Sequence, residues 1–296
     1  MKYAASFGAA LVLCAVAPAN AQQVRTFVST VGDDLAACSR SAPCKTFAGA
    51  LSKTGLGGEI TCLDAGGYGS VTITKSITLN CEGVAGSILG SAGIVSITIN
   101  AGTTGDVALR NINLFGNGGP AGIRVTSART VTVQNVRIND FTGEGIHVLP
   151  GSTSTNLYVR DSRITDVASG IVLTSSGGTI KAQIDNTRID GKLHRPDDRQ
   201  PECRREHQQF GDRKFGHGPV CERRRHDQRV AQYHRALTQG ARVGVSGGAI
   251  NLSQNAFDDN TVAISFVAGG IVSSAGDNGI IGPPGQAPTG AAISFR

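Results

Sequence analysis

Arginine and aspartate side chains recur together along this chain, at a spacing that suits the binding of a negatively charged ligand. The residues concerned are Arg137, Arg163, Arg188, Asp140, Asp166 and Asp190. An arginine guanidinium holds a carboxylate through two parallel hydrogen bonds, so a row of arginines could bind the uronate groups of an acidic polysaccharide. The alternative is a solvated face on which the aspartates offset the arginine charges, and exposed pairs of that kind contribute little to stability.

The three arginines occupy the same place in a repeat, and the repeat predicts how they are positioned. Residues 109–114, 133–138, 159–164 and 184–189 share one pattern, with mostly apolar residues at the first, fourth and sixth places and Asn or Asp at the third. A fixed period of roughly 25 residues is typical of a solenoid. Because neighbouring strands lie about 4.8 Å apart, we expect the arginines, at the fifth place, to stack in an outward column.

The composition also favours many short strands joined by turns. The chain of 296 residues holds 40 glycines, no tryptophan and one methionine, and abundant Val, Ile, Thr, Ser and Asn fit strands and turns. In a solenoid each coil buries its inward face against its neighbours, so the strands can form one elongated domain. We predict an all-β solenoid with coils over residues 57–191 and last coils, followed by a C-terminal tail, over residues 243–296.

The stretch before the coils is expected to form an N-terminal cap over residues 22–56. Within it, residues 46–53 place Phe47 and Leu51 four residues apart, which predicts one short amphipathic helix. A solenoid needs a polar cover over its first coil, and this helix is well placed to supply it.

Residues 1–21 have the pattern of a secretory signal peptide. Lys2 precedes an apolar run that ends in small residues, so we expect cleavage after Ala21. The run is shorter than the about 20 apolar residues that span a bilayer. We therefore expect an exported protein, extracellular or periplasmic, with no membrane span after cleavage.

The cysteines agree with export to an oxidising compartment. Cys38 and Cys44 close a short polar loop and are disulfide candidates. Cys62 and Cys81 lie in strand-like runs, where a bridge between neighbouring coils and two buried free thiols are both open. The pairs lack the spacing and companion histidines of a zinc site, so we expect no metal centre.

Residues 192–242 do not fit the repeat. This segment carries the whole net charge of +6 and five of the six histidines, and it lacks alternating apolar and polar residues. A nucleic-acid-binding insertion, a disordered loop and a stretch translated out of frame would each account for it. Reading one nucleotide later converts codons for His, Gln and most Arg into codons for Ile, Thr, Ser, Asn, Val, Ala and Gly, the residues of the repeats.

Out-of-frame translation is the interpretation we favour. For residues 207–212, the shifted frame permits Ile-Ser-Asn-Ser-Ala-Ile, which matches the repeat. We therefore predict compensating frameshifts near Lys192 and Val243, and no nucleic-acid partner. Because inward-facing charged residues would be unpaired, we expect the segment as translated to loop out or stay unstructured.

The chain resembles the secreted bacterial right-handed parallel β-helix proteins of the pectate-lyase-like superfamily. The resemblance rests on residues 25–29, the Cys38 to Cys44 loop with residues 45–50, the passage 67–77 and the Asn-bearing coils. It covers roughly residues 24–191 and 243–275, and it implies a right-handed parallel β-helix. It does not imply one activity, because this superfamily includes lyases, hydrolases, esterases and adhesins.

Two short motifs inside residues 192–242, which we call the anomalous segment, are similar to motifs of known enzymes. Gly216-His217-Gly218 and Asp197-Asp198 resemble elements of polygalacturonases. We discount both, because short motifs match often by chance and no strand pattern here would hold the carboxylates across a cleft.

Two functions remain open from the sequence. The first is a non-catalytic β-helix that binds surfaces, an acidic polysaccharide or a cell-surface glycan, with no cofactor. The alternative is a carbohydrate-active enzyme, either a polysaccharide lyase or a glycoside hydrolase, acting on an acidic polysaccharide. For a lyase, the superfamily resemblance implies β-elimination with an arginine base and a Ca²⁺ ion held by aspartates. The absence of a dense acidic cluster favours the first. Glu144 and His147 are interpreted as isolated surface residues.

Overall fold

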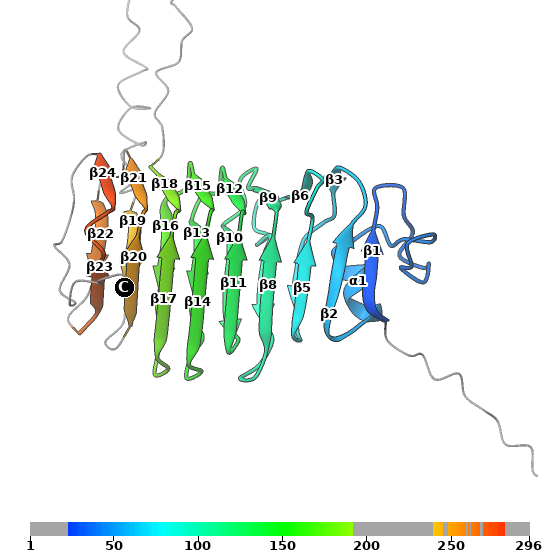
Figure 1. The fold of residues 1–296 in the computed structure, drawn as a ribbon, viewed down its shortest axis with the longest axis horizontal. Helices are drawn as coiled ribbons and strands as arrows, with labels where there is room; N and C mark the ends of the chain where they lie inside the picture. Colours follow the sequence, from blue (N-terminus) through cyan, green and yellow to red (C-terminus); the bar gives the residue numbers. More distant parts are fainter. Residues whose placement is uncertain are drawn as a thin grey trace, which may run out of the picture.

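The chain winds through three parallel β-sheets, which we name A, B and C (Figure 1). The computed structural model describes residues 23–191, 239–244, 248–258, 260, 262–266 and 269–281. In these residues every named strand pairs in parallel with the equivalent strand of the next coil, and a single helix, α1 (Phe47–Lys53), lies at the N-terminal end. This is the right-handed parallel β-helix that the sequence predicted.

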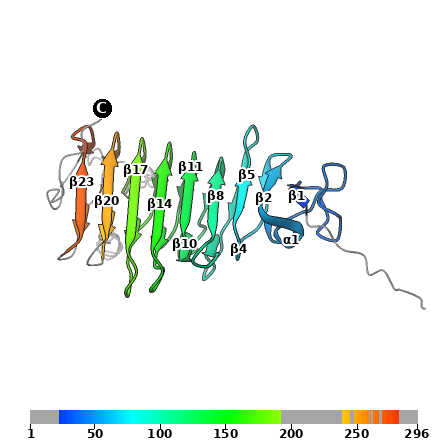
Figure 2. The ribbon, with the colours of Figure 1, turned by 60° about the horizontal axis from the view of Figure 1, so that its bottom comes forward.

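The strands of each sheet follow one another in spatial order along the solenoid. Sheet A contains β1 (Gln23–Val28), β2 (Thr54–Cys62), β5 (Ile77–Asn80), β8 (Asp106–Arg110), β11 (Thr130–Gln134), β14 (Thr155–Arg160), β17 (Ile180–Asp185), β20 (Ala249–Ser253) and β23 (Ile271–Ser274). Sheet B contains β3 (Gly66–Gly67), β6 (Gly86–Leu89), β9 (Ile112–Phe115), β12 (Arg137–Asn139), β15 (Arg163–Thr165), β18 (Arg188–Asp190), β21 (Ala256–Asp258) and β24 (Gly279–Ile281). Sheet C contains β4 (Val71–Ile73), β7 (Ile97–Asn100), β10 (Ala121–Ser127), β13 (Glu144–Val148), β16 (Ser169–Leu173), β19 (Gln239–Val243) and β22 (Val262–Phe266). Figure 2 shows sheet A with its strands side by side along the whole length.

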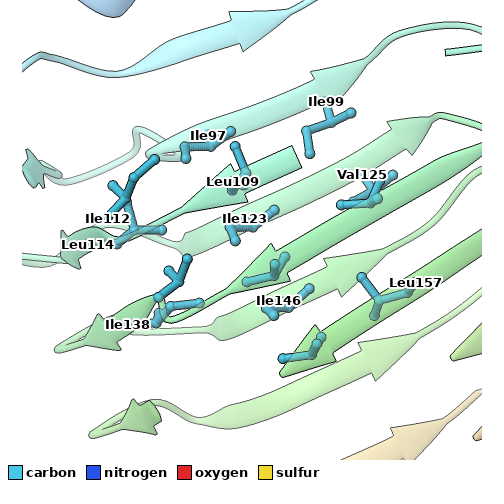
Figure 3. Close-up of a cluster of buried hydrophobic side chains, with 14 of the residues drawn as sticks. Ile97, Ile99, Leu109, Ile112, Leu114, Ile123, Val125, Ile138, Ile146 and Leu157 are labelled. Carbon is cyan, nitrogen blue, oxygen red and sulfur yellow. The ribbon is translucent and has the colours of Figure 1, made fainter. Parts of the chain in front are cut away.

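The core consists of columns of aliphatic side chains that run along the solenoid. In sheet A, Leu109, Val133, Val159 and Ile184 are in register from coil to coil and are buried. Similar columns from sheets B and C meet them inside the coils, as the side chains in Figure 3 show. Each coil therefore buries apolar surface against the coil before it and the coil after it, which is the main stabilising contribution in this fold.

The corner between sheets A and B depends on a column of polar residues with left-handed backbone. Asn111, Asn135, Asp161, Asn186 and Gln254 all have positive φ, between 45° and 58°. Asn tolerates this conformation better than most residues because its short side chain can hydrogen-bond locally. The side chains also bond along the column, with Asn135 Nδ2 donating to Asn111 Oδ1 at 2.6 Å. The Asn or Asp at the third place of each repeat therefore makes the turn, as expected.

A column of glycines lies where each coil enters sheet C. A side-chain carbon at Gly145 would come within 2.6 Å of Ile164 Cγ2 and 2.7 Å of the Gly170 carbonyl oxygen. Gly122 and Gly170 are equally crowded by the neighbouring coil. Only glycine allows the coils to approach this closely at this place.

The predicted capping helix forms, although β1 and the start of β2, inside the predicted cap range 22–56, belong to sheet A. Thr46 caps α1 by accepting a hydrogen bond from the Gly49 amide, and the helix buries Phe47, Ala50 and Leu51 against the first coils. The Cys38–Cys44 disulfide is present, with a Cα–Cα distance of 4.6 Å. Backbone bonds from residues 38–44 to β1 cover the open edge of sheet A, which protects it from pairing with another chain.

The second pair of cysteines is also bridged. Cys62 ends β2 and Cys81 follows β5, the next strand of sheet A, and their Cα atoms are 4.7 Å apart in a disulfide. Of the two alternatives left open by the sequence, the bridge between neighbouring coils is the one the structure contains. Two disulfides fit a protein that folds in an oxidising compartment.

The coils continue across the anomalous segment. β17 pairs directly with β20, β18 with β21 and β16 with β19. In neighbouring coils, residues 140–143 or 166–168 connect sheet B to sheet C, whereas residues 191–238 connect β18 to β19. β19 begins at Gln239, so the last residues of the range 192–242 belong to the solenoid. The predicted frameshift near Lys192, the signal peptide, Gly216-His217-Gly218 and Asp197-Asp198 fall on residues outside those that the structure describes, whereas Val243, near the second predicted frameshift, ends β19.

Asp64 ties the end of β1 to the first turn of the solenoid. Its carboxylate accepts hydrogen bonds from Ser29 Oγ at 2.7 Å, from Tyr68 Oη at 2.7 Å and from the Thr30 amide at 3.0 Å. Burial alone would raise the pKa of Asp64, but these hydrogen bonds outweigh it and lower the pKa to about 2. The ionised form is therefore the one that the fold favours.

We expect Asp64→Asn to remove a pH-dependent part of the stability. The folded pKa lies below the unfolded value of 3.8, so the stabilisation is present above pH 3.8 and is lost as the pH falls toward 2. Denaturant unfolding should show the variant about 1–2 kcal/mol less stable than the wild type at pH 6, with the difference disappearing near pH 2. A constant difference at both pH values would contradict this role for Asp64.

We also predict that resequencing the gene across the codons for residues 185–250 reveals two compensating single-base changes, near codons 192 and 243. Reading through them should restore coils rich in Asn and Ile. An unchanged sequence would contradict the frameshift, and limited proteolysis of the protein would then show whether the segment is cut while the disulfide-linked coils persist.

Candidate functional site

The three predicted arginines stack on the outer face of sheet B. Arg137 is the register partner of Arg163, and Arg163 is the partner of Arg188. All three side chains are exposed. We call these residues the arginine row; the strands β12, β15 and β18 hold it because Ile138, Ile164 and Ile189, one place further on, point into the core and fix the register.

Carboxylates neutralise the C-terminal part of the arginine row. Asp190 is only 3% exposed, and it lies 3.0 Å from Arg163 Nη2 and 2.8 Å from Arg188 Nε. Arg188 also bonds Asp258 of the next coil, Nη2 to Oδ2, at 2.9 Å. The repeat did not suggest Asp258. These charge-assisted hydrogen bonds hold both guanidinium groups in fixed positions. About half of each arginine side chain stays exposed to solvent.

Asp140 and Asp166 lie at the corner that follows sheet B and do not pair with the arginine row. Their backbones are left-handed, with φ of 63° and 53°, so their role in the structure is in the turn. No ion pair joins either of them to an arginine within the described ranges. Of the three predicted aspartates, the structure therefore brings only Asp190 to the arginines.

Arg137, at the other end of the row, is the arginine with spare hydrogen-bonding capacity. Among the described residues its side chain makes no hydrogen bond and no ion pair, and it lies beside Asn113 of the preceding coil. A guanidinium presents five N–H donors in a planar fork, which suits a carboxylate or sulfate group. The arginine row thus offers one unpaired guanidinium next to two anchored ones.

A second group of charged residues lies on sheet C, and the sequence interpretation missed it. Arg124 in β10 is the register partner of His147 in β13. His147 Nε2 shares a hydrogen bond of 2.9 Å with Thr174 Oγ1, and its Nδ1 lies 3.7 Å from Glu144 Oε1. The interpretation of Glu144 and His147 as isolated surface residues was wrong. The missed signal is that Gly122-Ile123-Arg124 and Gly145-Ile146-His147 are the same place in consecutive coils.

The surroundings of His147 favour its neutral form. Burial lowers the pKa of His147 below its usual value of 6.5, and the positive charges of Arg124 and Arg242 lower it further, while the Glu144 carboxylate opposes them. Arg242 lies on β19, two coils beyond His147 with Val172 between them. At neutral pH the group therefore consists of two cations, one carboxylate and an uncharged imidazole.

Three further features of the described residues bear on whether they form a metal site, a ligand pocket or a membrane span. Within the described ranges, no three His, Cys, Asp or Glu side chains are grouped so that they could hold a metal ion. A shallow hollow on sheet A, open to solvent, is lined mainly by small side chains such as Ser76, Thr78, Thr130 and Thr132. None of the helices among the described residues is long and apolar enough to cross a membrane.

A protein-family model agrees with the fold. Residues 57–189 match the family model described as right handed beta helix region. The crystal structure of pectate lyase Pel9A aligns with a TM-score of 0.39 and 13% sequence identity, over 91% of this chain and 81% of that chain. No curated protein matches the chain. The sheet order and the match over residues 57–189 together show that the chain folds as a right-handed parallel β-helix.

We expect Asp190→Asn to destabilise the solenoid by about 2 kcal/mol, because it removes a buried carboxylate that accepts charged hydrogen bonds from two arginines. Denaturant unfolding at neutral pH measures this. Asp140→Asn is the matched control: Asn suits the same left-handed turn, and Asp140 has no arginine partner in the described chain, so its effect should be near zero. Equal effects of the two substitutions would contradict the assigned role of Asp190.

Proposed function

We propose that this is an exported, non-catalytic β-helix protein that binds an acidic polysaccharide along the arginine row of sheet B. The observation that carries the proposal is Arg137, an exposed guanidinium without a partner among the described residues, in register with Arg163 and Arg188. A polymer with carboxylates at regular intervals can contact a row that repeats about every 4.8 Å. Multiple weak contacts along one chain then add up to useful avidity.

The anchoring of the row supports binding. Asp190 fixes the guanidinium groups of Arg163 and Arg188 before any ligand arrives, so less side-chain freedom is lost on binding. The same carboxylate also weakens the positive field of the row. We therefore expect modest affinity that falls with added salt, since the contacts are exposed and screened.

Export supports the same function. The pattern of residues 1–21 predicts a signal peptide, and the two disulfides suit an extracellular or periplasmic location. An acidic polysaccharide or a cell-surface glycan is available to the protein in either location. The alternative, a lyase or hydrolase acting on such a polymer, is distinguished by whether the bound polymer is shortened.

Retention on immobilised polygalacturonate tests the proposal. Arg137→Ala should weaken retention about tenfold, which corresponds to one charge-assisted contact of about 1.4 kcal/mol. Arg160→Ala, which removes the same charge from an exposed place at the end of β14 on sheet A, is the matched control and should bind like the wild type. Equal retention of all three proteins would exclude the arginine row as the binding surface.

The same samples decide between binding and catalysis. After incubation with soluble polygalacturonate, we expect no new reducing ends and no ultraviolet absorbance from unsaturated uronate products. If the wild-type protein forms either product and Arg137→Ala does not, the protein is an enzyme that acts on this polymer, and the non-catalytic binding function is wrong.

A further inference from the structure

Arg124 is an arginine on sheet C with a donor that lacks an acceptor. Its Nε is buried and has no hydrogen-bond partner among the described residues. A buried N–H without an acceptor costs free energy, so such groups in folded proteins usually indicate a missing partner. The side chain as a whole is half-buried, and it faces away from the core because Ile123 and Val125 on either side point inward.

His147 lies directly beside Arg124 on the next coil and has a fixed orientation. Its register partners are Arg124 on one side and Val172 on the other. The Thr174 hydroxyl is hydrogen-bonded to Nε2, and the Glu144 carboxylate lies 3.7 Å from Nδ1, so Nδ1 has no hydrogen bond among the described residues. With 18% of the side chain exposed, the ring can still be reached from solvent. The strands that carry this guanidinium and this imidazole thus lie about 4.8 Å apart, and both side chains leave the same face of sheet C, so one oxyanion can contact both.

We propose that Arg124 and His147 form an oxyanion-binding site on sheet C, which takes a carboxylate or a sulfate group and binds it more tightly when His147 is protonated. The site lies on a different sheet from the arginine row and does not rest on the proposed function. The oxyanion accepts hydrogen bonds from the Nε and Nη edge of Arg124, reached after a change of its rotamer, which satisfies the orphan donor.

The pH dependence follows from the charges that face His147. From its own strand, Glu144 attracts a proton to the ring; from β10 and β19, Arg124 and Arg242 repel it; β16 contributes the uncharged Val172 and the adjoining Thr174. A bound anion offsets the arginine charges and so raises the pKa of His147. By linkage, the anion then binds more tightly to the protonated form, and affinity rises as the pH falls through the pKa of His147 in the complex toward its lower pKa in the free protein.

Proton NMR of the His147 ring in the full chain tests the site. The ring signals are identified by their absence in His147→Gln, because the other five histidines give signals of their own. Titrations from pH 5 to pH 8 are run in sodium sulfate, sodium acetate and sodium chloride at equal ionic strength. We expect the pKa of His147 to be about one unit higher in saturating sulfate or acetate than in chloride, which means about tenfold tighter binding to the protonated form. The larger of the two shifts identifies a sulfate or a carboxylate as the preferred group.

Substitutions locate the site. Arg124→Gln should abolish the anion-dependent shift and, in chloride, raise the pKa of His147, because a neighbouring positive charge is gone. Arg137→Gln on sheet B should change neither result. If the wild-type pKa is the same in all three salts, or if Arg124→Gln keeps the shift, the proposal is wrong. Comparing the pKa of His147 in the wild-type protein among the three salts tests the proposal even if a variant fails to fold. The result does not depend on whether the protein is retained on polygalacturonate.

Discussion

In-register pairing of successive coils is the constraint on which the rest of this structure depends. Every strand of the described residues pairs in parallel with the equivalent strand of the next coil, so any residue type that recurs in the repeat becomes a column along the solenoid. Aliphatic columns make the core, asparagines make one corner, and glycines allow close approach at another. A slip of one residue would turn every inward side chain outward, so the apolar columns fix the polar ones too.

The corners of the solenoid explain why spacing along the sequence does not identify which aspartates pair with the arginine row. Asp140 and Asp166 follow their arginines by three residues, but the third residue is already in the turn, where the backbone is left-handed and the side chain leaves the face of sheet B. Asp190 follows by two, which returns it to the strand and beside the guanidinium groups. A difference of one residue therefore separates a turn former from a buried ion-pair partner.

Much of the fold was predictable because it follows from local patterns. The repeat gave the coils, Phe47 and Leu51 gave the capping helix, and the short loop gave the Cys38–Cys44 bridge. Contacts between coils were harder to predict, because they join residues far apart in the chain. Asp258 contacts Arg188 although residues 191–238 lie between their coils, and Arg124 is brought beside His147 only by the register of sheet C. The Cys62–Cys81 bridge needed the same register to be decided.

Stacking of like residues also limits where a charged ligand can bind. Arginines about 4.8 Å apart repel one another, so a row of them is stable only if carboxylates lie between them or solvent screens them. Asp190 and Asp258 supply these carboxylates for Arg163 and Arg188. The two arginines therefore contribute to the stability of the coils whether or not a ligand is bound. Arg137 and Arg124 lie where the described chain provides no such carboxylate bond. In a parallel stack, it is the break in a pattern of paired charges, rather than the pattern itself, that indicates a place for a ligand.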